Sequence, residues 1–388
     1  MALSVLDWAA CGIAGRAEGG FSAWAETLRG QGACTRFDGR SSGAAETALV
    51  NGTLSHALDY DDTHFAHIGH PSVVVVSAAL AVAQARGASM SDMIDAALVG
   101  AEASVAAGLW LGRAHYQIGF HQTATAGTFG AAVAAGRLMD LDDAQMRHAL
   151  GLAATMASGL KAQFGTMGKP LNAGLAARAG VEAAQWAAAG MTSAADGLAG
   201  PLGFGDTHHG VGADVPFAWR MGDVSHKFHA CCHGLHATLE ALRTVKALRA
   251  ADAVRIETHP RWLTVCNNPD PDTGLAAKFS YAHVTAMAAH GISTADIAQF
   301  TDACAQAPDL VAWRKRVTVA GEPSLTEMQA RVVIGGEAYT ADLAVTDPDA
   351  RAARCLQKAR ALVGARADDL MQAIRADDLP AFAQLLTS

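Results

Sequence analysis

Alanine- and glycine-rich apolar stretches run through the first 200 residues of this 388-residue chain. Small side chains let helices pack closely against one another, and many of these stretches are apolar on more than one face. Apolar residues recur at helical spacing in four of them. We therefore expect a buried helical bundle that includes helices over 73–86, 91–112, 141–160 and 171–189.

The expected helices carry end signals. Pro71 suits the start of the first helix, and Gly87 suits its end. Ser91 is the expected N-cap of the second helix, with acidic residues in its first turn. Asp142 or Asp143 is expected to begin the third.

The pattern changes near residue 200. The segment "GLAGPLGFGDTHHGVGADVP" (197–216) is rich in turn residues and indicates a domain boundary or an active-site loop. Stretches at 253–266, 316–321 and 328–346 show the β-branched alternation of strands, and the last contains Gly335-Gly336 at hairpin spacing. We expect an all-helical domain at 1–219, an α+β domain at 220–346 and C-terminal helices at 347–388.

Composition excludes several classes of protein. The net charge of −8 and the lack of a basic cluster disfavour nucleic acid as a partner. No stretch reads as about 20 consecutive strongly apolar residues, so no membrane span is expected. The N-terminus lacks a basic region and places Asp7 within its apolar stretch, which argues against a secretory signal. The seven scattered cysteines suit a reducing cytoplasm and form no C-x-x-C pair for zinc.

The segment "HALDYDDTHFAHIGHPS" (56–72) packs four histidines and three aspartates into seventeen positions. A metal site would favour histidines at i, i+4 on a helix, or a facial triad with a carboxylate. The turn residues before His70 argue against one continuous helix through this segment. A metal site and a structural polar loop remain alternatives here, and proton transfer or substrate binding is favoured over both.

Three further segments carry polar groups within apolar surroundings. In "GFHQTATAGTFG" (119–130), His121 precedes a small-residue helix whose free N–H groups could hold a carboxylate. In "FGTMGKPLNAGLAARAG" (164–180), Lys169 precedes a proline near a helix start, where it binds an anion or simply reaches solvent. In "HKFHACCHGLHATLEAL" (226–242), Cys232 and His236 have a metal-compatible spacing but no obvious third ligand, and the cysteines also suit plain packing.

These segments, in this order and together with "AKFSYAH" (277–283), resemble the MmgE/PrpD family. Its reactions include 2-methylcitrate dehydration, cis-aconitate decarboxylation and iminodisuccinate epimerisation. The resemblance implies a mainly α fold, in which N- and C-terminal helices form one large domain and a smaller α+β lid domain is inserted. It also implies a site between the domains, a homodimer, and catalysis of a small anionic carboxylate without metal or cofactor.

The resemblance also implies roles for residues that match the family's motifs. Catalytic positions fall on Asp59, His70, His121 and Lys169, and substrate-binding positions on Thr63, Lys227, Cys232, His236 and His283. Two departures leave the substrate open. The chain has His283 where the lid helix commonly carries an aromatic residue, and Phe228-His229-Ala230 replaces the usual Pro-Tyr-Pro after the lid lysine.

The family's reactions share the making or breaking of a bond next to a carboxylate, through an enolate-like intermediate. We expect Lys169, Lys227 and His121 to hold negative charge, and His70, oriented by Asp59, to move the proton. Thr63 would position substrate or water. A lyase is favoured, an epimerase of the iminodisuccinate type is the alternative, and an inactive helical binding protein is the remote third. The acid, the stereochemistry and the choice among dehydration, decarboxylation and epimerisation stay open.

Overall fold

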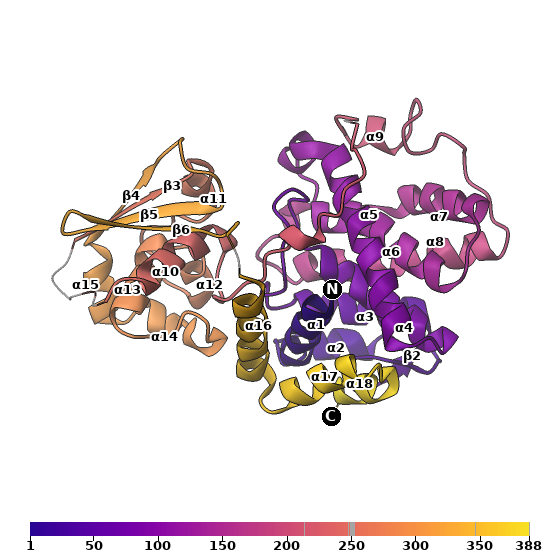
Figure 1. Ribbon diagram of the computed structural model, residues 1–388, viewed down its shortest axis with the longest axis horizontal. Coiled ribbons are helices and arrows are strands. Elements are labelled where there is room, and N and C mark those ends of the chain that lie inside the picture. The colour runs from indigo at the N-terminus through magenta and orange to yellow at the C-terminus, as the bar shows by residue number, and fades with distance from the viewer. Residues whose placement is uncertain (213, 247, 249–252, 346, 388) are drawn as a thin grey trace. The chain divides into compact units, whose positions relative to one another are not determined.

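A computed structural model describes residues 1–212, 214–246, 248, 253–345 and 347–387. Contacts divide the chain into two compact units (Figure 1). Unit 1 combines Met1–His226 with Cys355–Ser388, and unit 2 is Lys227–Arg354. Unit 1 is helical apart from one very short strand pair, and unit 2 mixes helices with a small sheet. The expected mainly α fold with a small α/β part is confirmed, while a lid role for unit 2 stays a prediction.

Unit 1 is a helical bundle in which α6 (Gln122–Leu138) packs against four other helices. Its partners are α4 (Pro71–Arg86), α5 (Met90–Gln117), α7 (Asp143–Met156) and α8 (Gly168–Ala188). The C-terminal α17 (Arg366–Arg375) and α18 (Leu379–Leu385) return to this unit, where α17 contacts α1 (Ala2–Gly15). The remaining elements are α2 (Phe21–Glu26), β1 (Cys34–Thr35), β2 (Ser41–Ser42), α3 (Ala44–His56) and α9 (Phe204–Thr207).

The helix starts follow the sequence signals with two corrections. At their C-terminal ends, α5 extends five residues beyond the expected 112 and α7 stops four residues short of the expected 160. Pro71 opens α4, Gly87 closes it with a φ of 67°, and Asp142 caps α7, as expected. The N-cap of α5 is Ser89 rather than Ser91, because the Ser89 side chain and Asp92 form a reciprocal capping box. Helix α8 begins at Gly168, three residues earlier than expected, which brings Lys169 into its first turn. Lys169 is therefore held by the helix rather than by the loop before it.

Two glycines allow α3 and α8 to touch. A Cβ atom on Gly52 would lie 2.9 Å from Gly174 Cα, and one on Gly174 would overlap Leu49 O. A side chain at either position would therefore force the helices apart. Because the contact lies near the end of α3 and the start of α8, it brings the segment after His56 towards the first turn of α8.

Helix α5 is long and apolar enough to cross a membrane by length and composition alone. Half of its most apolar 18-residue window is buried, and it packs against α4 and α6. The core helix of a bundle has the same properties.

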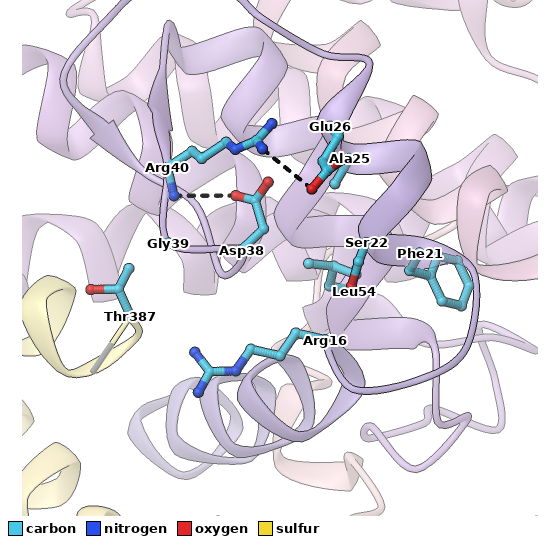
Figure 2. A pocket seen from close by; sticks show the side chains of 10 residues that line it. All are labelled: Arg16, Phe21, Ser22, Ala25, Glu26, Asp38, Gly39, Arg40, Leu54 and Thr387. Carbon is cyan, nitrogen blue, oxygen red and sulfur yellow. Dashed lines mark hydrogen bonds and ion pairs between the residues drawn. The ribbon is translucent and has the colours of Figure 1, made fainter.

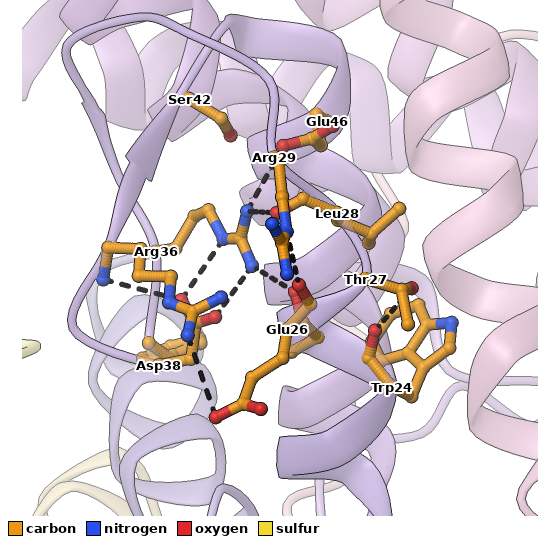
Figure 3. Close-up of polar contacts among 12 residues, drawn as sticks. Trp24, Glu26, Thr27, Leu28, Arg29, Arg36, Asp38, Ser42 and Glu46 are labelled. Carbon is orange, nitrogen blue, oxygen red and sulfur yellow. Dashed lines mark hydrogen bonds and ion pairs between the residues drawn. The ribbon is translucent and has the colours of Figure 1, made fainter.

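A buried guanidinium ties the segment before α3 to the bundle (Figure 3). Arg36 donates to both carboxylate oxygens of Asp38, at 3.0 and 2.6 Å, and to Glu46 Oε1 at 3.0 Å. It also donates to the carbonyls of Leu28 and Ala25. A buried charge is tolerated when it is paired and hydrogen-bonded in this way, so the network helps to fix the loop beside the core residue Phe37.

A second buried cation joins the C-terminal helices to α1. Lys358, on α16 (Pro348–Val363), lies 2.6 Å from Asp7 Oδ1, and both side chains are at most 3% exposed. Its ammonium also donates to the carbonyl of Tyr60 and lies 4.0 Å from the centre of that ring. Lys358 therefore links α16, α1 and the segment after α3.

Unit 2 is built on a four-stranded sheet with the order β4-β3-β5-β6. Strand β3 (Val254–Thr258) pairs in parallel with β4 (Val317–Gly321) and antiparallel with β5 (Gln329–Ile334). Strands β5 and β6 (Glu337–Asp342) form the expected hairpin, and Gly335 and Gly336 adopt the positive φ of its turn. Residues 213 and 346, within two of the segments analysed from sequence, lie outside the described residues.

Along the sequence, the helices of unit 2 come before β3 or between β3 and β4. They are α10 (His236–Arg243), α11 (Arg261–Val265), α12 (Gly274–Ala277), α13 (Tyr281–Ala289), α14 (Asp302–Ala305) and α15 (Pro308–Arg314). Helix α10 packs on β5 and β6, and α13 packs on β4 and α15. Helix α16 begins in unit 2 and ends in unit 1.

We predict that Lys358→Met lowers the free energy of unfolding by about 3 kcal/mol, because it leaves Asp7 buried without its counter-charge. Urea unfolding followed by circular dichroism measures this. The exposed Lys315→Met is the matched control and should change stability by less than about 0.5 kcal/mol. The double variant Asp7→Leu/Lys358→Met should recover much of the loss. A single Lys358→Met variant as stable as wild type would contradict the proposed link.

Candidate functional site

Side chains from four helix ends and one loop meet inside unit 1. His56 ends α3, His70 and His121 immediately precede α4 and α6, and Lys169 lies in the first turn of α8. The loop after α3 adds Asp59 and Asp61. We call these six residues the histidine cluster: His56, Asp59, Asp61, His70, His121 and Lys169.

The loop that carries the cluster is held in an unusual backbone conformation. Asp59 has a φ of 50° and Ile68 a φ of 58°, and a positive φ is unfavourable for a β-branched residue. At Gly69, a Cβ atom would lie 2.8 Å from Thr123 Oγ1 on α6, so only glycine permits this approach. The same hydroxyl accepts a hydrogen bond from His70 N at 3.1 Å. The loop is thus fastened to the first turn of α6, which fixes the backbone of His70.

Asp59 occupies the accessible side of the cluster. Its side chain is 33% exposed, and its Oδ1 atom lies 2.7 Å from Lys169 Nζ and 3.4 Å from His70 Nε2. One carboxylate oxygen therefore faces both a cation and an imidazole. A small anion could reach these groups from solvent and compete with Asp59 for Lys169.

Asp61 occupies the buried side. Its carboxylate is 2.9 Å from His56 Nδ1 and 3.0 Å from His70 Nδ1, and the two rings meet edge to face with centres 4.6 Å apart. Burial by itself would raise the pKa of Asp61, but the neighbouring His56 and His70 hold it well below its usual range. Asp61 is therefore ionised across the physiological range of pH.

His121 is held as a neutral imidazole. Its backbone N–H donates to Gly159 O at 2.9 Å, and the Asn172 amide donates to Leu160 O and to His121 Nδ1, at 3.2 and 3.3 Å. Burial lowers the pKa of His121 well below its usual value, and His56 and Lys169 lower it further. Because Nδ1 accepts from Asn172, the proton of the neutral ring lies on Nε2.

Residues outside the histidine cluster also hold the loop that follows α3. Lys358 binds the carbonyl of Tyr60, and Ser72 Oγ donates to Asp62 Oδ2 at 2.6 Å. Burial raises the pKa of Asp62 to about 7, with a further contribution from the Asp7 carboxylate. Each residue from 60 to 62 is thus anchored by a different partner.

The structure brings together the four residues expected to be catalytic and adds three that sequence reasoning left out. His56, Asp61 and Asn172 all contact the expected residues. His56 ends α3, and its ring faces Asp61. The i, i+3 spacing of Lys169 and Asn172 on α8 was a signal that could have been used.

Other polar residues of the segment have structural partners. His64 Nε2 lies 2.9 Å from Arg220 O, and His67 Nε2 lies 2.7 Å from Ser104 Oγ. Thr63 forms an isolated backbone bridge with Ser225. Its role in positioning substrate stays a prediction.

The expected substrate-binding residues of unit 2 stay predictions as well. Lys227 and His236 are buried, and His236 opens α10. Burial lowers the pKa of His236 well below its usual value, followed by the effects of His233, His229 and Lys227. Cys232 N donates to Lys278 O at 2.9 Å. His283, on α13, lies 4.0 Å from Cys304 Sγ, and burial with Arg314 nearby lowers its pKa to about 4.

A separate pocket of about 390 Å³ opens between the first helices and the C-terminus of unit 1 (Figure 2). Arg16 points into the space below the loop that carries Asp38 and Arg40. Arg40 pairs with Glu26 at 3.5 Å, and its backbone N–H donates to Asp38. The pocket shares no residue with the histidine cluster, and its titratable groups are mainly arginine and carboxylate. We assign no chemistry to it.

Comparison with known proteins decides the family. Residues 1–213 match the MmgE/PrpD N-terminal domain, and residues 229–367 match the MmgE/PrpD C-terminal domain. The chain belongs to the MmgE/PrpD family. The resemblance expected from the sequence motifs is thereby confirmed over most of the chain.

Several MmgE/PrpD relatives are named as cis-aconitate decarboxylases. The protein from Aspergillus terreus is 28% identical over 286 residues, covering 64% of this chain and 58% of the relative. The Homo sapiens protein is 30% identical over 223 residues, covering 54% and 46%. A cis-aconitate decarboxylase-like protein from Aspergillus oryzae is 29% identical over 272 residues, covering 62% and 56%. This chain spans about half the length of these relatives, and their names support a lyase at the family level.

Four residues of the cluster carry atoms that could bind a metal ion. Ligand atoms of His56, Asp59, Asp61 and His70 lie within 4.8 Å of one another. However, the Lys169 ammonium lies 2.7 Å from Asp59 Oδ1, and Asp61 is directed at two imidazole nitrogens. A divalent cation would have to share this space with an ammonium, which opposes binding electrostatically. The donor set therefore fits an internal ion-pair network better than a metal centre.

We predict that protein purified without a histidine tag contains far less than one equivalent of zinc, iron or manganese by elemental analysis. The repulsion between a metal ion and Lys169 is the reason. Lys169→Met provides the contrast, because removing the ammonium should raise the affinity for added zinc. Stoichiometric metal in the wild-type protein would overturn the metal-free assignment.

We predict that Asp62→Asn flattens the pH dependence of stability. The pKa of Asp62 is about 7 in the folded protein and about 3.9 when unfolded, so its stabilisation is full below pH 4 and is lost as the pH rises through 7. At pH 8 the variant should be more stable than wild type by about 1–3 kcal/mol. Urea unfolding from pH 4 to 8 measures this, with the exposed Asp196→Asn as control. An unchanged slope would refute the buried-proton assignment.

Proposed function

We propose that this protein is a cofactor-independent lyase that acts next to a carboxylate of a small di- or tricarboxylic acid. Asp59, His70, His121 and Lys169 carry the chemistry, and Thr63, Lys227, Cys232, His236 and His283 bind the substrate. The observation that supports this most directly is the placement of Lys169 and His70 around one accessible oxygen of Asp59. Such a site offers a cation for an anionic substrate and an imidazole for its proton.

Helix ends add to the positive potential of the cluster. His70 and His121 immediately precede the N-termini of α4 and α6, and Lys169 lies in the first turn of α8. The N-terminus of a helix carries a partial positive charge and free N–H groups. Three such ends favour the binding of a carboxylate and the build-up of negative charge on the reacting substrate.

The two histidines have different roles in this proposal. His70 Nε2 faces the accessible side, so it transfers a proton to or from the substrate. His121 is neutral in the free protein and carries its proton on Nε2, so it donates a hydrogen bond to a substrate carboxylate rather than acting as a fixed cation. A bound dianion raises the pKa of His121, which allows it to serve as an acid later in the cycle.

Among lyase reactions we favour decarboxylation, because the named relatives are cis-aconitate decarboxylases. The bond between the departing carboxylate and carbon breaks and releases CO₂. Its electron pair moves into the remaining unsaturated acid, where Lys169 stabilises the negative charge on a carboxylate. Protonated His70 then delivers its proton to carbon, and solvent restores that proton.

The same groups suit two other outcomes. In a dehydratase, His70 would remove the proton next to the carboxylate and a protonated His121 would assist the departure of hydroxide. In an epimerase of the iminodisuccinate type, two groups on opposite faces would exchange the proton, and the "FGTM-x-KP" and "GLAARAG" motifs resemble that branch. An inactive binding protein is the remote alternative.

We further propose a cytoplasmic homodimer. All seven cysteines are free thiols, which suits a reducing compartment. Leu175 and Trp186 are 47% and 39% exposed and lie eleven residues apart on α8, close to three helical turns. Exposed apolar side chains on one helix suit a protein interface.

The decisive experiment incubates the protein with cis-aconitate, 2-methylcitrate and iminodisuccinate and follows each by NMR. We predict loss of CO₂ from a polycarboxylate, with His70→Gln and Lys169→Met lowering kcat/KM by at least about 100-fold. The reason is that the first variant removes the proton carrier and the second removes the cation. Lys315→Met and the wild-type protein serve as controls.

The products discriminate among the reactions. Water loss would move the assignment to a dehydratase, and inversion without loss of mass would move it to an epimerase. Solvent deuterium incorporation that survives both His70→Gln and Lys169→Met would refute the roles given to these residues. No turnover and no binding of any of the three acids would refute the proposed substrate class.

A further inference from the structure

We infer that Asp61, rather than Asp59, is the positioning residue for the ring of His70. It keeps a proton on His70 Nδ1 and so leaves Nε2 as the nitrogen that exchanges a proton. The inference deepens the proposed function, because it rests on His70 as the group that moves a proton. It assigns Asp61 no contact with substrate.

The two carboxylates lie on opposite nitrogens of one ring. Asp61 Oδ2 is 3.0 Å from His70 Nδ1, whereas Asp59 Oδ1 is 3.4 Å from His70 Nε2. Asp61 is 1% exposed, and Asp59 has a 33% exposed side chain that is already paired with Lys169. The buried carboxylate is therefore the stronger electrostatic partner, because water and Lys169 screen the other.

An ionised Asp61 requires a proton on the nitrogens that face it. His56 Nδ1 is hydrogen-bonded to both of its oxygens, and His70 Nδ1 lies 3.0 Å from Oδ2 at an ion-pair distance without hydrogen-bond alignment. The negative charge of Asp61 therefore favours N–H at Nδ1 in each ring, through a hydrogen bond in His56 and through electrostatic attraction in His70. A neutral His70 then presents the lone pair of Nε2 on the accessible side, as a base needs. A protonated His70 presents Nε2–H, as an acid needs, and Asp61 stabilises that charge.

His56 gives Asp61 its orientation. It bonds both carboxylate oxygens, at 2.9 and 3.0 Å, and its ring packs edge to face on His70. Among the residues that the structure describes, His56 Nε2 has no hydrogen-bond partner, so Nδ1 is the nitrogen through which the ring is held. His56 and Asp61 together form the buried wall against which His70 is fixed.

Nitrogen-15 NMR of labelled wild-type protein tests the tautomer without any substrate. His70 signals are identified by their absence in His70→Gln, and neutral His70 should carry its proton on Nδ1. A predominant Nε2–H form in the wild type would overturn the inference. This outcome depends on the ring alone, so it stands apart from success or failure of the proposed reaction.

Asp61→Asn supplies the second test. The amide cannot accept from both rings, so the Nδ1–H form of His70 should fall and its pKa should drop by at least about one unit. With a turned-over acid, kcat should fall by about 100-fold or more while KM changes little, because the proton carrier is misoriented and Lys169 is untouched. The neighbouring Asp62→Asn is the matched control, since Asp62 bonds Ser72.

The outcomes separate cleanly. An Asp61→Asn protein with unchanged His70 tautomer and pKa would refute the inference whatever its activity. An altered tautomer in a protein that turns over none of the acids would support the inference and refute the proposed function. If Asp61→Asn does not fold, the wild-type NMR measurement alone decides.

Discussion

Close packing between α3 and α8 is the constraint on which the arrangement of unit 1 depends. Gly52 and Gly174 leave no room for side chains between the two helices, so the end of one helix reaches the beginning of the other. Lys169 can then approach Asp59 although 110 residues separate them in the chain. A larger residue at the glycine contact would act on the histidine cluster indirectly, by moving a helix rather than by touching a residue of the cluster. The close approach of the α3 and α8 backbones thus determines which charged side chains meet.

The loop between α3 and α4 resolves an electrostatic conflict. Three aspartates occur within four residues, and like charges so close together oppose folding. The three carboxyl groups are stabilised in different ways. Asp59 pairs with Lys169, and Asp61 pairs with two imidazoles. Asp62 keeps a proton near neutral pH because it is buried. One carboxylate thus remains accessible while its neighbours hold the backbone. The backbone strain at Asp59 and Ile68 is tolerated because these anchors act on both sides of it.

Much of the helical architecture could be predicted from periodicity and end signals, because proline, glycine and aspartate act locally at α4 and α7. The hairpin at Gly335-Gly336 was predictable for the same reason. The N-cap of α5 was misplaced, since Ser89 and Ser91 look equivalent until Asp92 selects one of them. Within the site, motif positions pointed to Asp59, His70, His121 and Lys169. The pairing of Asp61 with His56 could not be predicted, because it depends on how the chain turns after α3 rather than on any local preference.

Unit 1 is discontinuous in sequence, and the ion pair of Lys358 with Asp7 closes it. Asp7 precedes Lys358 by 351 positions, so on the ribosome it emerges long before its partner. The whole of unit 2 must be synthesised between them. Until then, the carbonyl of Tyr60 lacks the ammonium that holds it, and α1 has an acidic side chain that favours water over the core. The loop that carries Asp59 and Asp61 would therefore reach its final shape only after α16 has been synthesised.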